Sequence, residues 1–343
     1  MKTIRVGLMR CDTHGLYYAP LMDKHDPLLL RDPSGLGCTD RGDSWMSGGA
    51  YFYHYTKYSN PALMTVPFVK GFRITKVWDP DWDAAEIMSK IFYSKPQVCD
   101  RPEEASEDVD MVFIADCNGD GSDHRKLAEP GLRKGVPTFV DKPFAYDVKD
   151  AVAMVKLARK RKTPLLSLSI LRTLPHFTRF RARFAEVGEL CFGTVENGGP
   201  GLAGQIHAIS LAQHLFGAGV ESVDSMGKEP LHYMRLEYGG RKGRPVHGVT
   251  VNCVIGPTPH CAFYASAYGP EGAVHSPPIG DYQFPWGAAR NLELARQMVL
   301  TGKPVVAYEE MIENVAVATA ARRAHKLGRA VRLSEVWRGA TRA

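Results

Sequence analysis

The stretch Val140-Asp141-Lys142-Pro143-Phe144-Ala145 joins a short apolar run to an amphipathic helix and is the strongest local signal in the sequence. Residues 137–140 form the apolar run, which has the length and composition of a buried parallel strand. Asp147 is expected to cap the helix, because apolar side chains recur on one face from Val148 to Ala158. Such a strand-to-helix unit is the building block of doubly wound α/β sheets.

Further apolar runs of strand length predict that this unit repeats along the chain. They lie at residues 4–9, 72–78, 111–115 and 165–170. Strands that alternate with helices predict a doubly wound, Rossmann-type first domain over residues 1–163. Residues 164–303 lack the alternation and are expected to form a second, α+β domain. Residues 304–343 are expected to return to the first domain as a helix from about Glu309 to Leu327, which Gly328 ends.

Residues 22–68 separate the first strand–helix unit from the second strand by far more than a connection usually needs. This insertion is rich in aromatic side chains, namely Trp45, Tyr51, Phe52, Tyr53, His54, Tyr55 and Tyr58. Two interpretations stay open. The segment could stack on a sugar or close as a lid, or it could form an oligomer contact or a packed cover.

Composition and charge narrow the class of protein. The 343 residues are 44% hydrophobic and 23% charged, which is typical of a globular protein. The formal net charge of +6 is spread along the chain rather than gathered in one patch, so no nucleic-acid partner is expected. No apolar run is long enough to cross a membrane, and the chain starts without a signal-peptide core. The seven scattered cysteines predict reduced thiols and a cytoplasmic location.

The turn after the first strand is where a dinucleotide-binding domain would hold the pyrophosphate. It reads Arg10-Cys11-Asp12-Thr13-His14-Gly15, so of the three glycines in the GxGxxG pattern only Gly15 is present. Asp79, at the end of the second strand, suits a ribose hydroxyl and would repel a 2′-phosphate, which favours NAD over NADP. A strand-end turn residue is an equally good explanation of Asp79.

Together with the first strand, Asp141-Lys142-Pro143 resembles the Glu-Lys-Pro segment of the Gfo/Idh/MocA family, and the resemblance extends over most of the chain. Asn118 looks like the family's Asn after the third strand, Arg172 like the Arg that opens the substrate domain, and residues 291–333 like the closing segment. The resemblance implies an open, mostly antiparallel sheet in the second domain, bound NAD, and a homodimer or homotetramer. It also implies nucleotide-binding roles for the residues Asp12, Thr13, His14, Gly15, Asp79, Asn118, Asp141 and Lys142.

The segment that would carry the chemistry resembles the family only in part. Members read Asp-x-Gly-x-His-x-x-Asp, whereas this chain has Ala203, Gln205, His207 and Ser210 at the four defined positions. The resemblance implies that Lys142 and His207 are the catalytic residues, since a His suits proton transfer near neutral pH. Arg172, His176 and Gln205 are the candidates for substrate contacts. No metal site is expected, because no closely spaced His or Cys pair is present.

Three functions remain open from the sequence. The first is an NAD(P)-dependent oxidoreductase that acts on a sugar, polyol or sugar derivative. The second, motivated by Ala203 and Gln205, is a glycosidase or lyase on the same fold, non-redox or redox-cycling. The third, motivated by Arg10 and Asp12, is a non-catalytic ligand-binding protein that has lost the nucleotide. Fold alone does not choose among them.

Overall fold

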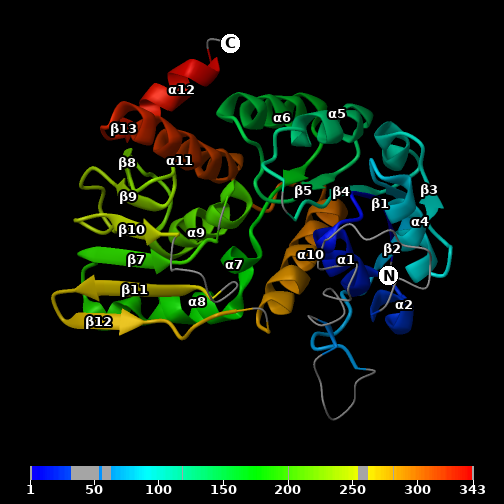
Figure 1. The fold of residues 1–343 in the computed structure, drawn as a ribbon, viewed down its shortest axis with the longest axis horizontal. Coiled ribbons are helices and arrows are strands. Elements are labelled where there is room, and N and C mark those ends of the chain that lie inside the picture. The colour runs from blue at the N-terminus through cyan, green and yellow to red at the C-terminus, as the bar shows by residue number, and fades with distance from the viewer. Residues whose placement is uncertain are drawn as a thin grey trace.

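The computed structural model describes residues 2–31, 54–55, 63–117, 119–199, 201–253, 262–280 and 282–341. Its architecture is two β-sheets side by side, each with helices packed against it (Figure 1). Most of the aromatic residues of the 22–68 insertion, and Asn118, lie outside the described residues. Among the described helices, none is long and apolar enough to cross a membrane.

The first sheet has the strand order β3-β2-β1-β4-β5-β6, and all its pairs are parallel. Its strands are β1 (Ile4–Met9), β2 (Phe72–Trp78), β3 (Gln97–Val98), β4 (Met111–Ile114), β5 (Thr138–Val140) and β6 (Leu165–Leu166). This is the order of a Rossmann sheet, and it confirms the predicted doubly wound fold. The chain reverses direction across the sheet between β1 and β4, so their carboxyl ends form the topological switch point where such sheets bind ligands.

Helices connect these strands: α1 (Thr13–Met22), α2 (Pro27–Arg31), α4 (Trp82–Ile91), α5 (His124–Lys134) and α6 (Val148–Arg161), with a 3₁₀ helix at Pro102–Ser106. α6 begins directly after Asp147, as the apolar stripe predicts. Gly7 in β1 is required by packing, since a Cβ there would lie 1.7 Å from the carbonyl oxygen of Ala105. The rings of Phe113 and Phe139 stack at 4.4 Å and join β4 to β5.

The second sheet has the order β12-β11-β7-β10-β9-β8-β13. Its strands are β7 (Phe192–Glu196), β8 (Ser222–Met226), β9 (Tyr233–Glu237), β10 (Val249–Asn252), β11 (Tyr264–Gly269), β12 (Gly272–His275) and β13 (Val331–Arg332). Only the β7–β10 pair is parallel among these strands, so the sheet is mostly antiparallel, as expected. α9 (Gly201–Phe216) packs on β7, where Gly193 leaves room for the ring of Phe216.

Further helices complete the two domains: α7 (Ile170–Thr173), α8 (Pro175–Ala182), a 3₁₀ helix at Arg183–Val187, α10 (Phe284–Thr301), α11 (Tyr308–Leu327) and α12 (Leu333–Thr341). α11 ends at Gly328 and contacts α6 of the first domain as well as β8 and α9 of the second. The domain boundaries at 163 and 303 stay predictions, although the first sheet reaches Leu166.

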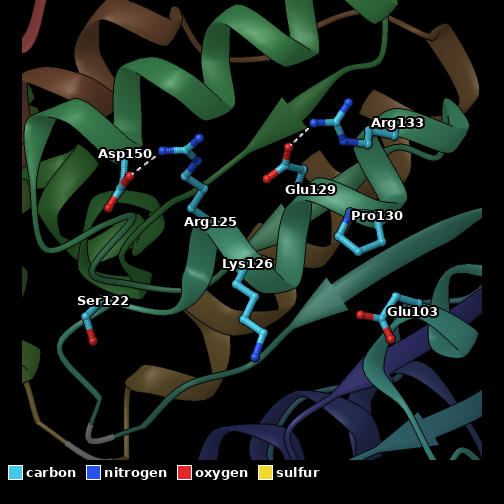
Figure 2. A pocket seen from close by; sticks show the side chains of 8 residues that line it. All are labelled: Glu103, Ser122, Arg125, Lys126, Glu129, Pro130, Arg133 and Asp150. Atoms are coloured by element: carbon cyan, nitrogen blue, oxygen red, sulfur yellow. Dashed lines mark hydrogen bonds and ion pairs between the residues drawn. The ribbon is translucent and has the colours of Figure 1, made fainter. Parts of the chain in front are cut away.

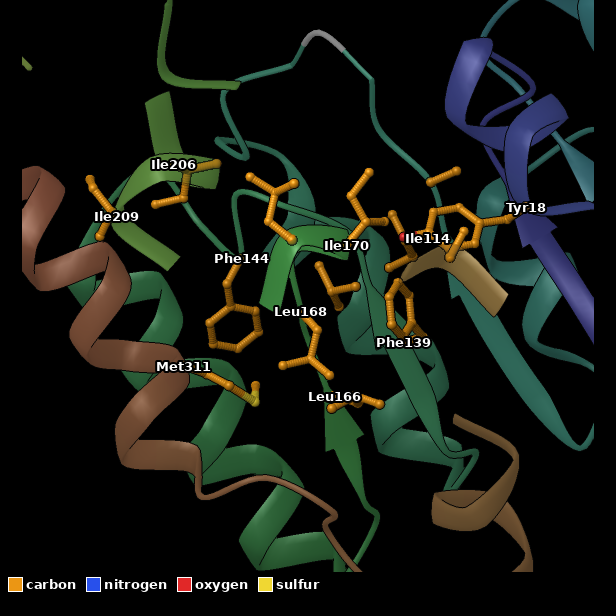
Figure 3. Packing of buried hydrophobic residues seen from close by; sticks show 14 of the residues in the cluster. Tyr18, Ile114, Phe139, Phe144, Leu166, Leu168, Ile170, Ile206, Ile209 and Met311 are labelled. Atoms are coloured by element: carbon orange, nitrogen blue, oxygen red, sulfur yellow. The ribbon is translucent and has the colours of Figure 1, made fainter. Parts of the chain in front are cut away.

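The structure differs from the expected strand over residues 165–170. The strand stops at Leu166, and Ser169 caps α7 by accepting a hydrogen bond from the N–H of Leu171. Residues 167–171 stay buried without being a strand. Leu168 and Ile170 join an apolar layer in which Phe144, Ile206 and Met311 also lie (Figure 3).

Candidate active site

Three loops at the carboxyl edge of the first sheet bring the predicted residues together. One follows β1 and holds Arg10 to Asp12, the second follows β4 and holds Cys117, and the third follows β5 and holds Asp141 to Pro143. Because parallel strands end at the same edge, residues far apart in the chain meet here.

Lys142 is the link between this edge and the second domain. Its side chain is 95% buried, and the peptide bond to Pro143 is cis. Lys142 Nζ donates hydrogen bonds to the carbonyl oxygen of Cys117 at 2.8 Å and to that of Ala203 at 3.1 Å. Ala203 lies one helical turn before His207 on α9, so Lys142 contacts the same end of α9 that presents His207.

His207 lies partly buried in α9, with its Nδ1 2.7 Å from Ser169 Oγ. Burial holds the pKa of His207 well below its usual value of 6.5, and the positive charges of Lys142 and His14 lower it further. His207 is therefore neutral at pH 7. In the tautomer that donates Nδ1–H to Ser169, Nε2 keeps a lone pair that can accept a proton.

His14 forms an ion pair with Asp141, and the side chain of Asp141 is almost completely inaccessible to solvent. His14 Nδ1 lies 2.5 Å from Asp141 Oδ2. The same carboxylate accepts hydrogen bonds from the backbone N–H of Lys142 at 2.8 Å and of Asp116 at 3.2 Å. Burial lowers the pKa of His14, but Cys117 and Asp141 raise it, and the result is about 10. His14 is thus a second fixed cation beside Lys142.

The His14–Asp141 pair gives a testable dependence of stability on pH. Because the pKa of His14 is raised to about 10, the pair's stabilisation is complete below about pH 6.5 and is lost as the pH rises through 10. Asp141→Asn leaves a buried imidazolium without its counter-charge, so we expect a loss of about 3–5 kcal/mol in the free energy of unfolding near pH 6. Urea unfolding near pH 6 and near pH 10 measures both quantities.

Asp150→Asn is the matched control, because Asp150 pairs with Arg125 at the surface at 2.9 Å. Exposed pairs contribute only about 0–1 kcal/mol, so this variant should unfold almost as the wild type does. Equal losses in the two variants, or an Asp141→Asn loss that is the same at both pH values, would contradict the assignment of a buried ion pair.

The turn between β1 and α1 is closed by side chains rather than by glycines. Arg10 has the left-handed backbone conformation (φ 69°) that usually favours glycine, and its guanidinium forms an ion pair with Asp123. Asp12 caps α1, whose first residue is Thr13. Gly15 is required, since a Cβ there would lie 2.5 Å from the carbonyl oxygen of Arg10.

Asp79 fixes this turn from the second strand. Its Oδ2 accepts a hydrogen bond from the N–H of Cys11 at 2.7 Å, and its Oδ1 accepts one from the N–H of Asp81 at 2.8 Å. The structure thus shows Asp79 in the turn role, and its ribose role stays a prediction.

A group of possible metal ligands lies beside the turn. The ligand atoms of Asp116, Asp123 and His124 lie within 4.8 Å of one another. Burial would raise the pKa of Asp116, but His124 and Arg10 lower it to about 2. His124 Nε2 already lies 2.9 Å from Asp116 Oδ2, and the guanidinium of Arg10 pairs with Asp123. The His124 ring and the Arg10 guanidinium thus already engage both carboxylates.

The predicted substrate residues have different surroundings. Arg172 donates to Gln213 Oε1 at 2.5 Å and forms an ion pair with Glu310 on α11, so its hydrogen bonds support the packing between helices. His176 lies in the first turn of α8, where burial and Arg179 lower its pKa. Gln205 is buried on α9, two residues before His207. Sequence reasoning missed Ser169, whose position just before a short helix is the signal of a capping serine.

A hollow of about 570 Å³ lies along α5 and shares no residue with this site (Figure 2). Arg125 pairs there with Asp150, and Arg133 pairs with Glu129. Its basic and acidic side chains are equal in number, which gives it no preference for a charged ligand.

Comparison with known proteins identifies the first domain. Residues 48–168 match the sequence model described as "Oxidoreductase family, NAD-binding Rossmann fold", the Gfo/Idh/MocA model. This agrees with the Rossmann order of the first sheet. No curated protein sequence matches the chain.

Solved structures of the same fold cover nearly the whole chain. One is an oxidoreductase from Agrobacterium radiobacter in complex with NAD⁺, L-tartaric acid and magnesium, at 16% identity and a TM-score of 0.70, with 97% of this chain and 99% of that chain covered. A second is myo-inositol dehydrogenase from Lactobacillus casei in complex with NAD(H) and myo-inositol, at 14% identity and 0.70, with 96% of each chain covered. A third is a myo-inositol dehydrogenase from Corynebacterium glutamicum, at 14% identity and 0.66, with 96% and 99% covered.

The residues present fit the family's nucleotide, NAD, at two places and resist it at a third. Asp79 at the end of β2 has acceptors for a ribose hydroxyl, and Lys142 stands at the switch point with its ammonium group. At the turn between them, the carboxylate of Asp12 occupies the N–H groups that a pyrophosphate would use. An NAD molecule would therefore meet suitable groups at two places in this Rossmann domain and an occupied helix N-terminus at the third.

Proposed function

We propose that this protein is an NAD-dependent oxidoreductase of the Gfo/Idh/MocA family that converts a hydroxyl of a sugar, polyol or sugar derivative to a carbonyl. The observation that carries the proposal is the hydrogen bond from Lys142 to Ala203, which brings the lysine of the first domain to the helix that presents His207. A proton acceptor and a cation over the carboxyl edge of a Rossmann sheet are the groups that alcohol oxidation requires.

In the proposed reaction, NAD supplies the acceptor for the hydride. His207 Nε2 takes the proton of the substrate hydroxyl, and the low pKa of His207 keeps it in the accepting form at neutral pH. Lys142 and His14 hold positive charge that stabilises the negative charge developing on the substrate oxygen. Burial of Lys142 and His207 strengthens these interactions, because little water remains to screen them.

The substrate class rests on the comparisons and on Gln205. Two of the similar structures are myo-inositol dehydrogenases. Gln205 stays a proposed substrate contact because its amide both donates and accepts, although it lies two residues before His207 on α9 and so on a different side of the helix. Appearance of NADH absorbance with a panel of cyclic and linear polyols tests the class. Identification of any nucleotide that co-purifies tests the cofactor.

We expect NAD(H) to bind more tightly than NADP(H), since the carboxylate of Asp79 would repel a 2′-phosphate. Asp79→Asn removes that charge and should reduce the preference about tenfold or more, with most of the change in NADP(H) affinity. Calorimetric titration of the wild type and the variant with both nucleotides gives the ratio. Equal affinities in the wild type would remove Asp79 from this role.

The third function from the sequence, a ligand-binding protein without nucleotide, is favoured by one observation, the occupation of the α1 N-terminus by Asp12. If neither NAD(H) nor NADP(H) binds to the wild type or to a variant without Asp12, that function replaces the one proposed.

We also propose that the second sheet pairs with that of another copy. Met226 on β8, Tyr233 on β9 and Tyr264 on β11 are between 37% and 58% exposed although they are large side chains. Alternate residues on these strands, such as Met234 and Ala265, are buried against the helices, so the exposed set lies on the opposite face. Analytical ultracentrifugation of the full chain reports whether it is a dimer or a tetramer.

A further inference from the structure

The carboxylate of Asp12 is bound more completely than helix capping requires. Its Oδ1 accepts hydrogen bonds from the N–H of His14 at 2.9 Å and of Gly15 at 3.0 Å. Its Oδ2 accepts one from the N–H of Cys117, in the loop after β4, at 2.6 Å. One side chain thus takes the free donors at the start of α1 and a donor from across the topological switch point.

Those donors face the place where a Rossmann domain binds the pyrophosphate of a dinucleotide, at the N-terminus of the first helix. A carboxylate resembles a phosphate group in the features that matter there, because it is an anion with several acceptor lone pairs. We propose that Asp12 is an internal substitute for the pyrophosphate, which must leave these N–H groups before NAD can bind, and that it sets the affinity for the nucleotide. The inference deepens the proposed function and rests on it.

The backbone does not explain why an aspartate stands here. The φ of Asp12 is −79° with an extended ψ, a conformation open to any residue, and Ser or Thr would also cap the helix. The charge itself is balanced on the other side of the turn, since Arg10 interacts electrostatically with Asp12, Asp116 and Asp123. A pyrophosphate that entered while Asp12 kept its place would meet both the loss of its donors and a fixed negative charge.

The experiment is calorimetric titration of the full chain with NAD⁺ and with NADH. Asp12→Gly removes the internal anion, and we expect the dissociation constant to fall about 10- to 100-fold, the range for regaining one hydrogen bond to a charged group. Without nucleotide, the same variant should melt at a lower temperature than the wild type, because α1 loses its cap. Asp12→Ser keeps a capping hydroxyl, so it supplies the measurement if the glycine variant fails to fold.

Asp26→Gly is the matched control. Asp26 Oδ1 accepts from the N–H of Leu28 at 2.8 Å and of Leu29 at 3.2 Å, so this variant also loses two capping hydrogen bonds. Asp26 follows the far end of α1, and its loss should lower stability without tightening NAD binding.

The outcomes separate the inference from the function on which it rests. Tighter binding by a folded Asp12 variant supports the inference, including the case in which the wild type shows no binding at all. Wild-type binding that either folded variant leaves unchanged or weakens overturns the inference and leaves the proposed function standing. Failure of the wild type and both variants to bind either nucleotide overturns the proposed function, and the inference with it.

Discussion

Lys142→Met should lower the turnover of the protein's substrate by about 10²- to 10⁴-fold, one of the two largest effects we expect from a single substitution. Methionine keeps an unbranched apolar side chain but removes the charge and the hydrogen bonds to the carbonyl oxygens of Cys117 and Ala203. Loss of these two hydrogen bonds from a charged donor adds a loss of about 1–3 kcal/mol in stability. Steady-state turnover at saturating nucleotide, with the melting temperature recorded beside it, separates the two effects.

Lys160→Met is the matched control, because Lys160 is exposed on α6 and is outside the site. This variant should keep wild-type turnover. If Lys142→Met is as active as the control on any identified substrate, then Lys142 is a structural residue that holds the two domains together. Nucleotide affinity measured on the same variant shows whether the lost turnover reflects binding or chemistry.

Much of the first domain could be predicted from the sequence, since its signals are local. β1 and β2 have the predicted bounds, and α6 follows Asp147, because buried parallel strands and amphipathic helices each leave a distinct pattern of apolar residues. The run at 165–170 shows the limit of that pattern. It is apolar because it is buried, but burial alone does not separate a strand from the capped turn that Ser169 makes.

The order of strands in the second sheet could not be predicted from the sequence. β7 pairs with β10 and β11 rather than with its neighbours in the chain, and β13 joins the edge from after α11. Such pairings depend on contacts between distant segments, and the strands are short and half-buried, so their pattern is weak.

The sequence predicted which residues belong to the candidate site, but not which of them contact one another. The sequence and the family resemblance pointed to Lys142, His207 and Asp141. Neither revealed that Asp141 pairs with His14, 127 positions away, or that Asp12 reaches Cys117, 105 positions away. The sequence shows that the turn departs from the glycine pattern. It does not show that the Asp12 carboxylate accepts hydrogen bonds from backbone N–H groups, because one of those groups belongs to the loop after β4.

His207→Asn should lower turnover by about 10²- to 10⁴-fold, as expected for the loss of a general base. The pH profile gives a sharper test. Since burial, Lys142 and His14 hold the pKa of His207 well below 6.5, turnover by the wild type should fall only at acidic pH, when His207 becomes protonated. Lys142→Met removes one of the charges that lower this pKa, so the acid limb of its residual activity should move to higher pH.

His275→Asn is the control for the histidine itself. His275 on β12 also has its Nδ1 beside a serine hydroxyl, that of Ser266 at 2.8 Å, but it is exposed on the second sheet. A structural role for His207 would make the two variants similar in turnover once their melting temperatures are matched. It would also leave the acid limb of Lys142→Met where the wild type has it. A general base coupled to Lys142 requires both the large loss of turnover and the shift, because the same proton-accepting nitrogen determines each of them.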